Sequence, residues 1–211
     1  MDTPALTALV LAGGEARRLG GAKRHLQVGG RSLLARSLDA AGEVAEEVLL
    51  LPGARPLPLP QTARCIPDRP GAPGPLGALA AGLDAARHDW CLLLPCDMPF
   101  IDPAVVRRLL AIAARGDADA VVVCSEHGRE PFHALYHRGA LPTVLCRLDD
   151  GERSLKGLLD ELTVHEVTRD AFVANDPGAR FLCNVNTPED LARARGLAEP
   201  VIEPATEEVP A

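Results

Sequence analysis

The chain has 211 residues, of which 47% are hydrophobic and 3% aromatic, and its formal net charge is −7 at pH 7. Such a hydrophobic content is ordinary for a globular protein, and the scarcity of aromatic residues means that the core rests on Leu, Val and Ala. The acidic balance argues against a general nucleic-acid binder, whose surface would be basic, so no nucleic-acid partner is expected. The length favours one domain, which we expect to span residues 1–198.

The cysteines and the apolar runs bear on the compartment. The six cysteines form no CxxC pair, and most lie in apolar stretches. This pattern is typical of buried, reduced thiols, so we expect a cytoplasmic protein without a disulfide framework. No N-terminal signal is visible, and the apolar runs are far shorter than the roughly 20 residues that span a bilayer, so no membrane partner is expected.

The first 125 residues alternate short apolar runs with helical patterns. The runs predict strands at 6–11, 47–51, 64–66, 90–95 and 118–124, and the patterns predict helices at 32–41, 76–87 and 103–115. Gly42 is expected to stop the first helix, and Asp102 followed by Pro103 is typical of a helix start. Because the strands are continuously apolar, we expect a mostly parallel sheet covered by helices on both faces.

The rest of the chain is less regular. It predicts strands at 131–137, 164–167 and 181–185, and helices at 140–148 and 153–162. Thr187 and Asp190 have the spacing of a helix cap, which predicts a last helix from Pro188. Residues 199–211 are rich in Pro and Glu without periodicity, which predicts a disordered tail.

The segment from Leu11 to Lys23 follows the first predicted strand and carries glycines and basic residues. Glycines in this place let backbone N–H groups approach a phosphate, and Arg17 and Lys23 add positive charge. The spacing matches neither GxGxxG nor GxxxxGK[ST], because the glycines stand at 13, 14, 20 and 21 and no Ser or Thr follows Lys23. We interpret it as a triphosphate-binding loop; a plain glycine turn with solvated arginines is the alternative.

Asp97 follows the most apolar predicted strand of the chain. Folds of this class bind ligands beyond the carboxyl ends of parallel strands. A carboxylate there can hold Mg²⁺, which bridges substrate phosphates through one or two protein carboxylates. The alternative is that Asp97 caps the following turn, but Asp102 is the better cap candidate.

Two further segments bring polar groups to the same predicted edge. In the turn from Pro67 to Gly77, the glycines permit close backbone contact with a ribose or base, and Asp68 can accept hydrogen bonds from sugar hydroxyls. A surface turn is the alternative. Asn184 and Asn186 lie on the same side of an extended segment, where their amides can bind a ligand or order a loop near the metal.

Other features of the sequence are weaker evidence for a functional site. His133 and His137 are four residues apart, but the segment is predicted to be extended, so they do not share a helical face. A Ser–His–Asp hydrolase has no support, because no GxSxG motif is present. Arg153 can touch a second anionic substrate or lie free on the surface.

With these motifs the chain resembles the molybdenum cofactor guanylyltransferases, a branch of the Rossmann-like nucleotidyltransferases. The likeness covers residues 5–197 and implies a three-layer α/β/α fold with a mostly parallel mixed sheet, of the nucleotide-diphospho-sugar transferase type. The matching pieces are Leu11-Ala12-Gly13-Gly14, Arg18-Leu19-Gly20, Lys23, Gly74-Pro75-Leu76-Gly77, Pro95-Cys96-Asp97-Met98-Pro99 and Asn184-Val185-Asn186-Thr187-Pro188-Glu189-Asp190.

The resemblance implies Mg²⁺-dependent transfer of GMP from GTP to the terminal phosphate of molybdopterin, with release of pyrophosphate. It further implies that GTP and molybdopterin are the binding partners of the protein. We expect a monomer or weak homo-oligomer. The resemblance implies that Leu11, Ala12 and Gly13 contact the nucleotide, Lys23 its phosphates, Asp68 the nucleoside, and Asp97 both GTP and the metal. We expect the nucleotide site to include Gly14, Gly77, Asn184 and Asn186 as well.

The expected chemistry is positioning and electrostatics. Asp97 would hold Mg²⁺, while loop amides with Lys23 and Arg17 or Arg18 stabilise charge on the α-phosphate and the leaving pyrophosphate. Two departures weaken base discrimination: Ala22 stands where the family usually has Asp, and Leu51-Pro52 where it often has Asn. A sibling transferase that uses CTP or another acceptor, a non-catalytic GTP-binding module and a dinucleotide-dependent oxidoreductase remain as alternatives, the last without the glycine fingerprint it needs.

Overall fold

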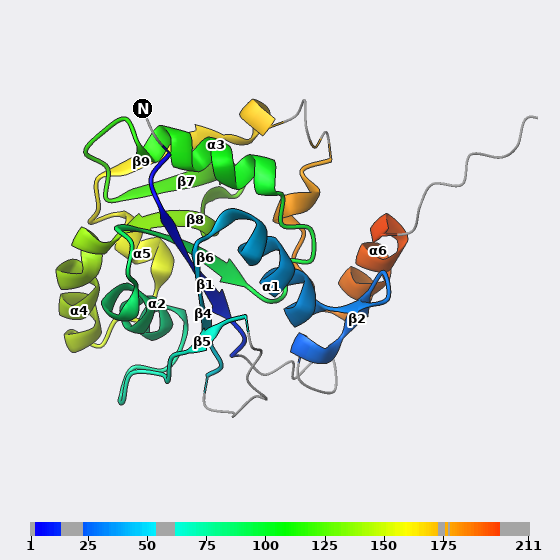
Figure 1. The fold of residues 1–211 in the computed structure, drawn as a ribbon, viewed down its shortest axis with the longest axis horizontal. Coiled ribbons are helices and arrows are strands. Elements are labelled where there is room, and N and C mark those ends of the chain that lie inside the picture. The colour runs from blue at the N-terminus through cyan, green and yellow to red at the C-terminus, as the bar shows by residue number, and fades with distance from the viewer. Residues whose placement is uncertain (1–2, 14–22, 54–61, 173–175, 177, 199–211) are drawn as a thin grey trace, which may run out of the picture.

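A computed structural model describes residues 3–13, 23–53, 62–172, 176 and 178–198. Its centre is a seven-stranded sheet with the order β5-β4-β1-β6-β8-β7-β9 (Figure 1). Its strands are β1 (Leu6–Leu11), β4 (Glu47–Leu51), β5 (Arg64–Cys65), β6 (Trp90–Pro95), β7 (Ala120–Ser125), β8 (Gly128–His137) and β9 (Val164–Thr168).

The sheet is mostly parallel, as the continuous apolar runs predict. β1 pairs in parallel with β4 on one side and with β6 on the other, and β9 pairs in parallel with β7. β8 runs antiparallel to both of its neighbours, β6 and β7. The predicted fold, a Rossmann-like three-layer arrangement with a mostly parallel mixed sheet, is confirmed.

Helices cover both faces of the sheet (Figure 1). α2 (Pro75–Ala85), α4 (Leu141–Asp149) and α5 (Leu155–Leu159) share one apolar core with the sheet, whereas α1 (Leu33–Val44) and α3 (Pro103–Ala113) share the other. β1 contributes to both cores, because side chains alternate along a strand: Leu9 packs into the first core, and Ala8 and Val10 into the second.

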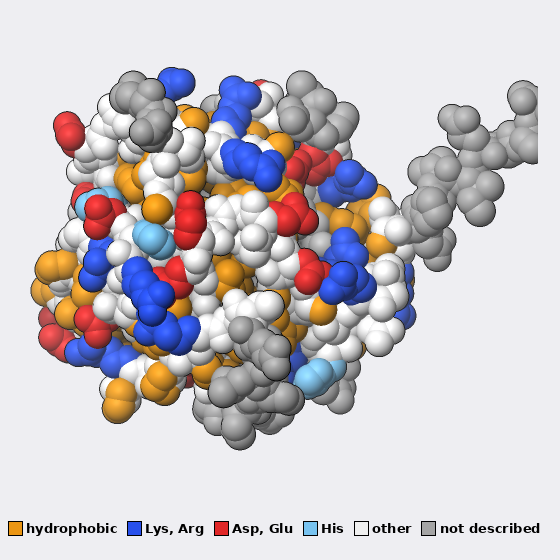
Figure 2. Space-filling view, viewed as in Figure 1, with side chains coloured by type: hydrophobic (Ala, Val, Ile, Leu, Met, Phe, Trp, Pro, Cys, Tyr) orange, Lys and Arg blue, Asp and Glu red, His pale blue; other side chains and the backbone are white. Residues whose placement is uncertain are grey.

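A smaller unit lies beside the sheet. β2 (Gln27–Val28) and β3 (Arg31–Ser32) form an antiparallel hairpin, and α6 (Pro188–Ala198) packs on it. The remaining short elements are 3₁₀ helices at Lys23–His25, Arg138–Ala140, Arg169–Phe172 and Arg180–Leu182. None of the helices in the described part of the chain has the length and hydropathy needed to cross a membrane. On the face shown in Figure 2, acidic and basic side chains are interspersed.

Most predicted elements are confirmed, with three differences. Gly42 lies inside α1, which continues to Val44. Residues 181–185 form no strand: a 3₁₀ helix ends at Leu182, and Phe181 is buried by ring contacts with Phe172 and His133 instead of by strand pairing. The hairpin at 27–32 was not predicted. The expected tail, 199–211, lies outside the described residues.

His133 is the most unusual residue of the sheet. It is fully buried in β8, has a φ of 55°, and lies edge-on to Phe181 at 5.4 Å between ring centroids. Burial lowers the pKa of His133 to about 4, although the Phe181 carbonyl, 3.4 Å from Nδ1, acts in the opposite direction. His133 is therefore neutral at physiological pH. His133 and His137 belong to no group of three or more potential metal ligands among the described residues.

The depressed pKa of His133 predicts acid sensitivity. The unfolded chain takes up a proton below pH 6.5, whereas the folded protein does so only near pH 4, so the free energy of unfolding falls between these values. The loss by pH 4 should reach about 3 kcal/mol. Urea unfolding of the wild type and of His133→Asn measures this loss of unfolding free energy. Asn is chosen because it tolerates the positive φ. The variant should lose less stability over this interval; parallel pH dependences would contradict the assignment.

Candidate functional site

A cavity of about 400 Å³ lies beyond the carboxyl ends of β1, β4 and β6. The chain runs from β1 outward to β4 and β5 and then returns to β6 on the other side of β1, so the strand order reverses at the β1–β6 boundary. Open α/β sheets bind ligands at such a reversal. Two backbone hydrogen bonds continue the pairing past the strand ends: Cys96 N donates to Leu11 O at 3.0 Å, and Ala12 N donates to Leu51 O at 2.9 Å.

One end of the cavity carries an ion pair. The Lys23 ammonium lies 2.9 Å from Oδ2 of Asp97, and the two side chains are 16% and 19% exposed. The same ammonium donates a hydrogen bond to Oδ1 of Asn186. Three positions far apart in the sequence, each expected to serve the site, are thus brought together.

The segment that carries the two asparagines is fixed against β6. Val185 N donates to the Asp97 carbonyl at 2.9 Å, and the Val185 side chain is buried in the core under α6. Because side chains alternate along an extended segment, the two flanking amides face away from that core. Asn186 N and Thr187 N both donate to the Asp190 carboxylate, and Asp190 N donates to Oγ1 of Thr187, so the predicted cap is present.

Two buried oxygen atoms at this end are without hydrogen-bond partners among the described residues. They are Oδ1 of Asp97 and Oδ1 of Asn184. An unpaired buried oxygen costs free energy unless a ligand or ion satisfies it. Oxygen atoms of a carboxylate and of amides are the donors that Mg²⁺ and Mn²⁺ accept. The residues present therefore fit a hard divalent cation, which Asp97 would hold.

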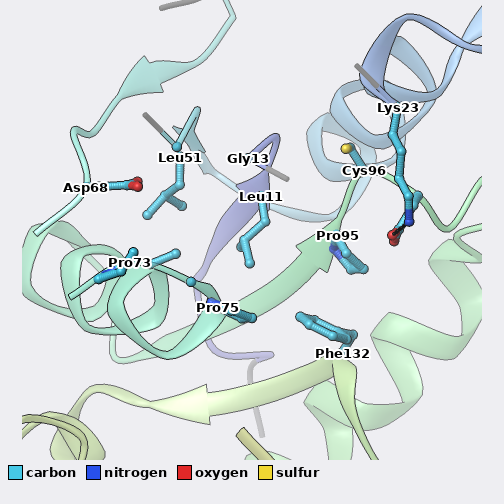
Figure 3. A pocket seen from close by; sticks show the side chains of 14 residues that line it. Leu11, Gly13, Lys23, Leu51, Asp68, Pro73, Pro75, Pro95, Cys96 and Phe132 are labelled. Carbon is cyan, nitrogen blue, oxygen red and sulfur yellow. Dashed lines mark hydrogen bonds and ion pairs between the residues drawn. The ribbon is translucent and has the colours of Figure 1, made fainter. Parts of the chain in front are cut away.

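The rest of the cavity is mainly apolar (Figure 3). Phe132, Pro75 and Leu11 face the central space, and Asp68 lies at the end opposite to Lys23. An apolar wall with a few polar groups is typical of a small-molecule site. Phe132 was not expected here, because β8 is far from the motif segments along the chain.

Gly13 and Gly53 bring the loops after β1 and β4 into direct contact. A Cβ atom on Gly53, whose φ is 72°, would lie 2.8 Å from the Cα atom of Gly13. Both glycines line the cavity. Gly13 was expected in the site, whereas Gly53 follows the Leu51-Pro52 pair and was missed.

Gly77 does not line the cavity directly. A Cβ atom on it would lie 1.7 Å from the Ala72 carbonyl oxygen, so its lack of a side chain lets the turn before α2 lie close to the helix. That turn supplies Pro73 and Gly74 to the cavity wall. Arg153 supports the same turn, since its guanidinium donates to the Gly71 carbonyl at 3.3 Å.

Two nearby groups have clear structural roles. Asp102 caps α3 by accepting a hydrogen bond from Ala104 N at 2.7 Å, which leaves Asp97 free for the site. Burial raises the pKa of Cys96, which lines the cavity, to about 12, so its thiol is protonated and is no nucleophile at neutral pH.

Not every expected site residue can be located. Ala12 is buried behind the cavity, where its carbonyl lies 3.5 Å from the Arg24 guanidinium. Leu11, Gly13, Lys23, Asp68 and Asp97 line the cavity. Gly14, Arg17 and Arg18 lie outside the described residues.

Comparisons with known proteins identify relatives of this chain by sequence and by fold. The molybdenum cofactor guanylyltransferase of Vibrio cholerae is 32% identical over 191 residues, which cover 90% of this chain and 91% of that protein. The crystal structure of molybdopterin-guanine dinucleotide biosynthesis protein A from Archaeoglobus fulgidus matches with a TM-score of 0.78 at 24% identity, covering 91% of this chain and 97% of that one. A Mycobacterium tuberculosis protein in complex with manganese matches with a TM-score of 0.65 at 17% identity, covering 91% and 98%.

The family model matches most of the chain. The MobA-like NTP transferase domain aligns with residues 8–167, a range that includes the carboxyl ends of β1, β4 and β6, which form the cavity. The resemblance to the molybdenum cofactor guanylyltransferases is confirmed by these matches. The chain is therefore a nucleotidyltransferase and belongs to the family of the MobA-like NTP transferase domain.

Proposed function

We propose that the protein transfers GMP from GTP to the terminal phosphate of molybdopterin, forming the guanine dinucleotide cofactor and pyrophosphate in a Mg²⁺-dependent reaction. The observation that carries this proposal is the Lys23–Asp97 pair at one end of a cavity at the strand-order reversal. The names of the relatives support the choice of substrates.

The ends of the cavity differ in what they can bind. The ammonium of Lys23 supplies charge for phosphates at one end, and Asp68 supplies hydrogen-bond acceptors for the nucleoside at the other. The N-terminus of α2, with Gly74 as its cap and Pro75 in its first turn, adds the positive end of a helix dipole to the wall between them.

Asp97, with the oxygen atoms of Asn184 and Asn186 beside it, would hold Mg²⁺, which neutralises charge on the triphosphate when bound. Lys23 orients the phosphates and stabilises the charge that develops on them. Arg17 or Arg18 adds to this charge. Gly13 lets the backbone approach the nucleotide closely.

The chemistry requires no general base. The attacking group is a phosphate of the acceptor, which is already anionic, so no proton has to be removed. The thiol of Cys96, protonated at neutral pH, provides no competing nucleophile. Catalysis then consists of holding two anionic substrates in line and stabilising the leaving pyrophosphate.

The direct test is pyrophosphate release from each of the four nucleoside triphosphates, with and without molybdopterin. We expect release from GTP that depends on molybdopterin. Leu51-Pro52, which stands where the family often has Asn, makes CTP the sharpest competitor. Preference for CTP would replace this proposal by a sibling cytidylyl transfer, and GTP binding without release in any mixture would indicate a non-catalytic module.

Asp97→Asn should lower the rate of pyrophosphate release by about 100-fold or more, because the charge that holds the metal is lost from the site. Circular dichroism should remain that of the wild type. Asp102→Asn is the matched control, since Asn caps a helix as well as Asp does, and its rate should be unchanged. Retained activity in Asp97→Asn would contradict the metal role.

Gly53→Ala should weaken GTP binding by about tenfold, or 1.4 kcal/mol, because its Cβ atom forces the loops after β1 and β4 apart. Gly30→Ala is the control for backbone strain: Gly30 has a φ of 74°, close to the 72° of Gly53, but no atom would lie within 4 Å of its Cβ. Isothermal titration calorimetry gives both affinities. Equal affinities in the two variants would show that the contact with Gly13 does not shape the nucleotide site.

A further inference from the structure

The Lys23 ammonium contacts oxygen atoms that would otherwise be available to a metal ion. It contacts Oδ2 of Asp97 at 2.9 Å and also Oδ1 of Asn186. The other Asp97 oxygen is buried and has no partner among the described residues, and the same holds for Oδ1 of Asn184, whose neighbour Val185 donates to the Asp97 carbonyl. A side-chain cation thus lies within the oxygen set that fits a divalent cation.

We propose that Lys23 is an internal counter-ion that keeps a divalent cation off Asp97 until a triphosphate arrives. This inference rests on the proposed function, which supplies the triphosphate, and it adds an order of events to it. Phosphate oxygens attract the ammonium away from Asp97, and the cation that accompanies the triphosphate takes its place on the carboxylate.

The exchange preserves charge at a partly buried site. In the nucleotide-free protein the carboxylate is neutralised by Lys23, with side chains only 16% and 19% exposed. Adding a divalent cation to that pair would place two cations on one carboxylate, which is unfavourable at low effective dielectric. When phosphates are present, each cation has its own anionic partner, so the repulsion is offset.

The position of Lys23 allows this exchange. The residue lies in the short 3₁₀ helix Lys23–His25 and lines the cavity, so its side chain can turn toward a ligand there without a change in the sheet. The backbone of Asp97, by contrast, is fixed by the hydrogen bond between its carbonyl and Val185 N. The ammonium, at the end of a long flexible side chain, is therefore the group that moves when phosphates bind.

The consequence is that nucleotide-free protein binds divalent cations weakly, and that removal of Lys23 strengthens this binding. The probe is Mn²⁺ alone, without nucleotide, measured by electron paramagnetic resonance of free Mn²⁺. We expect Lys23→Met and Lys23→Gln to bind Mn²⁺ at least about tenfold more tightly than wild type, because a fixed positive charge is removed from the ligand set.

The controls separate charge from structure. Lys156→Met removes the only other lysine of the chain, which is exposed in α5, and should leave the Mn²⁺ affinity unchanged. Lys23→Arg keeps the charge and should bind weakly, like wild type. Asp97→Asn combined with Lys23→Met should lose the gain. Lys23→Gln keeps a donor toward Asp97, so it serves where the methionine variant does not fold.

A second readout is thermal. Mn²⁺ should raise the Tm of Lys23→Gln more than that of wild type, because binding to the folded state stabilises it. Unchanged Mn²⁺ affinity in folded Lys23→Met or Lys23→Gln, or a gain that survives the loss of Asp97, would overturn the proposal. Because no turnover is measured, a negative result here leaves the pyrophosphate assay untouched, and failure of that assay leaves the Mn²⁺ result standing.

Discussion

The site depends on the parallel pairing of β1 with β4 on one side and β6 on the other. Parallel strands end at the same edge, so this pairing places the loops after Leu11, Leu51 and Pro95 side by side. The hydrogen bonds from Cys96 N to Leu11 O and from Ala12 N to Leu51 O extend that alignment past the strands. A shift in register would separate Asp97 from the loops it works with.

Electrostatics then determines what the edge can bind. Asp97 and Lys23 neutralise each other in the free protein. Through this pair, a chain of net charge −7 holds an ammonium group at the place where we expect anionic phosphates to bind. A carboxylate buried alone would be costly, and its pairing with an ammonium is stabilising only while the geometry is maintained. The backbone bond from Val185 to Asp97 maintains that geometry from the far end of the chain.

The sequence was informative where local chemistry decides the structure. The six consecutive apolar residues of β6 predict a buried strand, and the acid that follows must then lie at its carboxyl end, which is how Asp97 could be found. Asn184 and Asn186 could be identified as candidates because a strand end followed by a capped helix explains Thr187 and Asp190 but not both asparagines. The cap of α3 at Asp102 could also be predicted from the sequence.

Contacts between segments that are far apart in the sequence could not be predicted in this way. Phe132 reaches the cavity only because β8 pairs antiparallel with β6, and a single sequence does not reveal that partner. Gly53 gains its meaning from Gly13, forty residues earlier. Phe181 is buried by aromatic contacts. A short apolar segment that is buried in this way has the same sequence pattern as a buried strand. The turn at Gly29 and Gly30, by contrast, carried a hairpin signal that was overlooked.

The most direct test of the account is a crystal structure of the protein with Mg²⁺ and a non-hydrolysable GTP analogue. We predict that the triphosphate lies at the Lys23 and Asp97 end of the cavity, with the metal on Asp97 and the base toward Asp68. A nucleotide bound away from the carboxyl ends of β1 and β6, or in the opposite direction along the cavity, would contradict it.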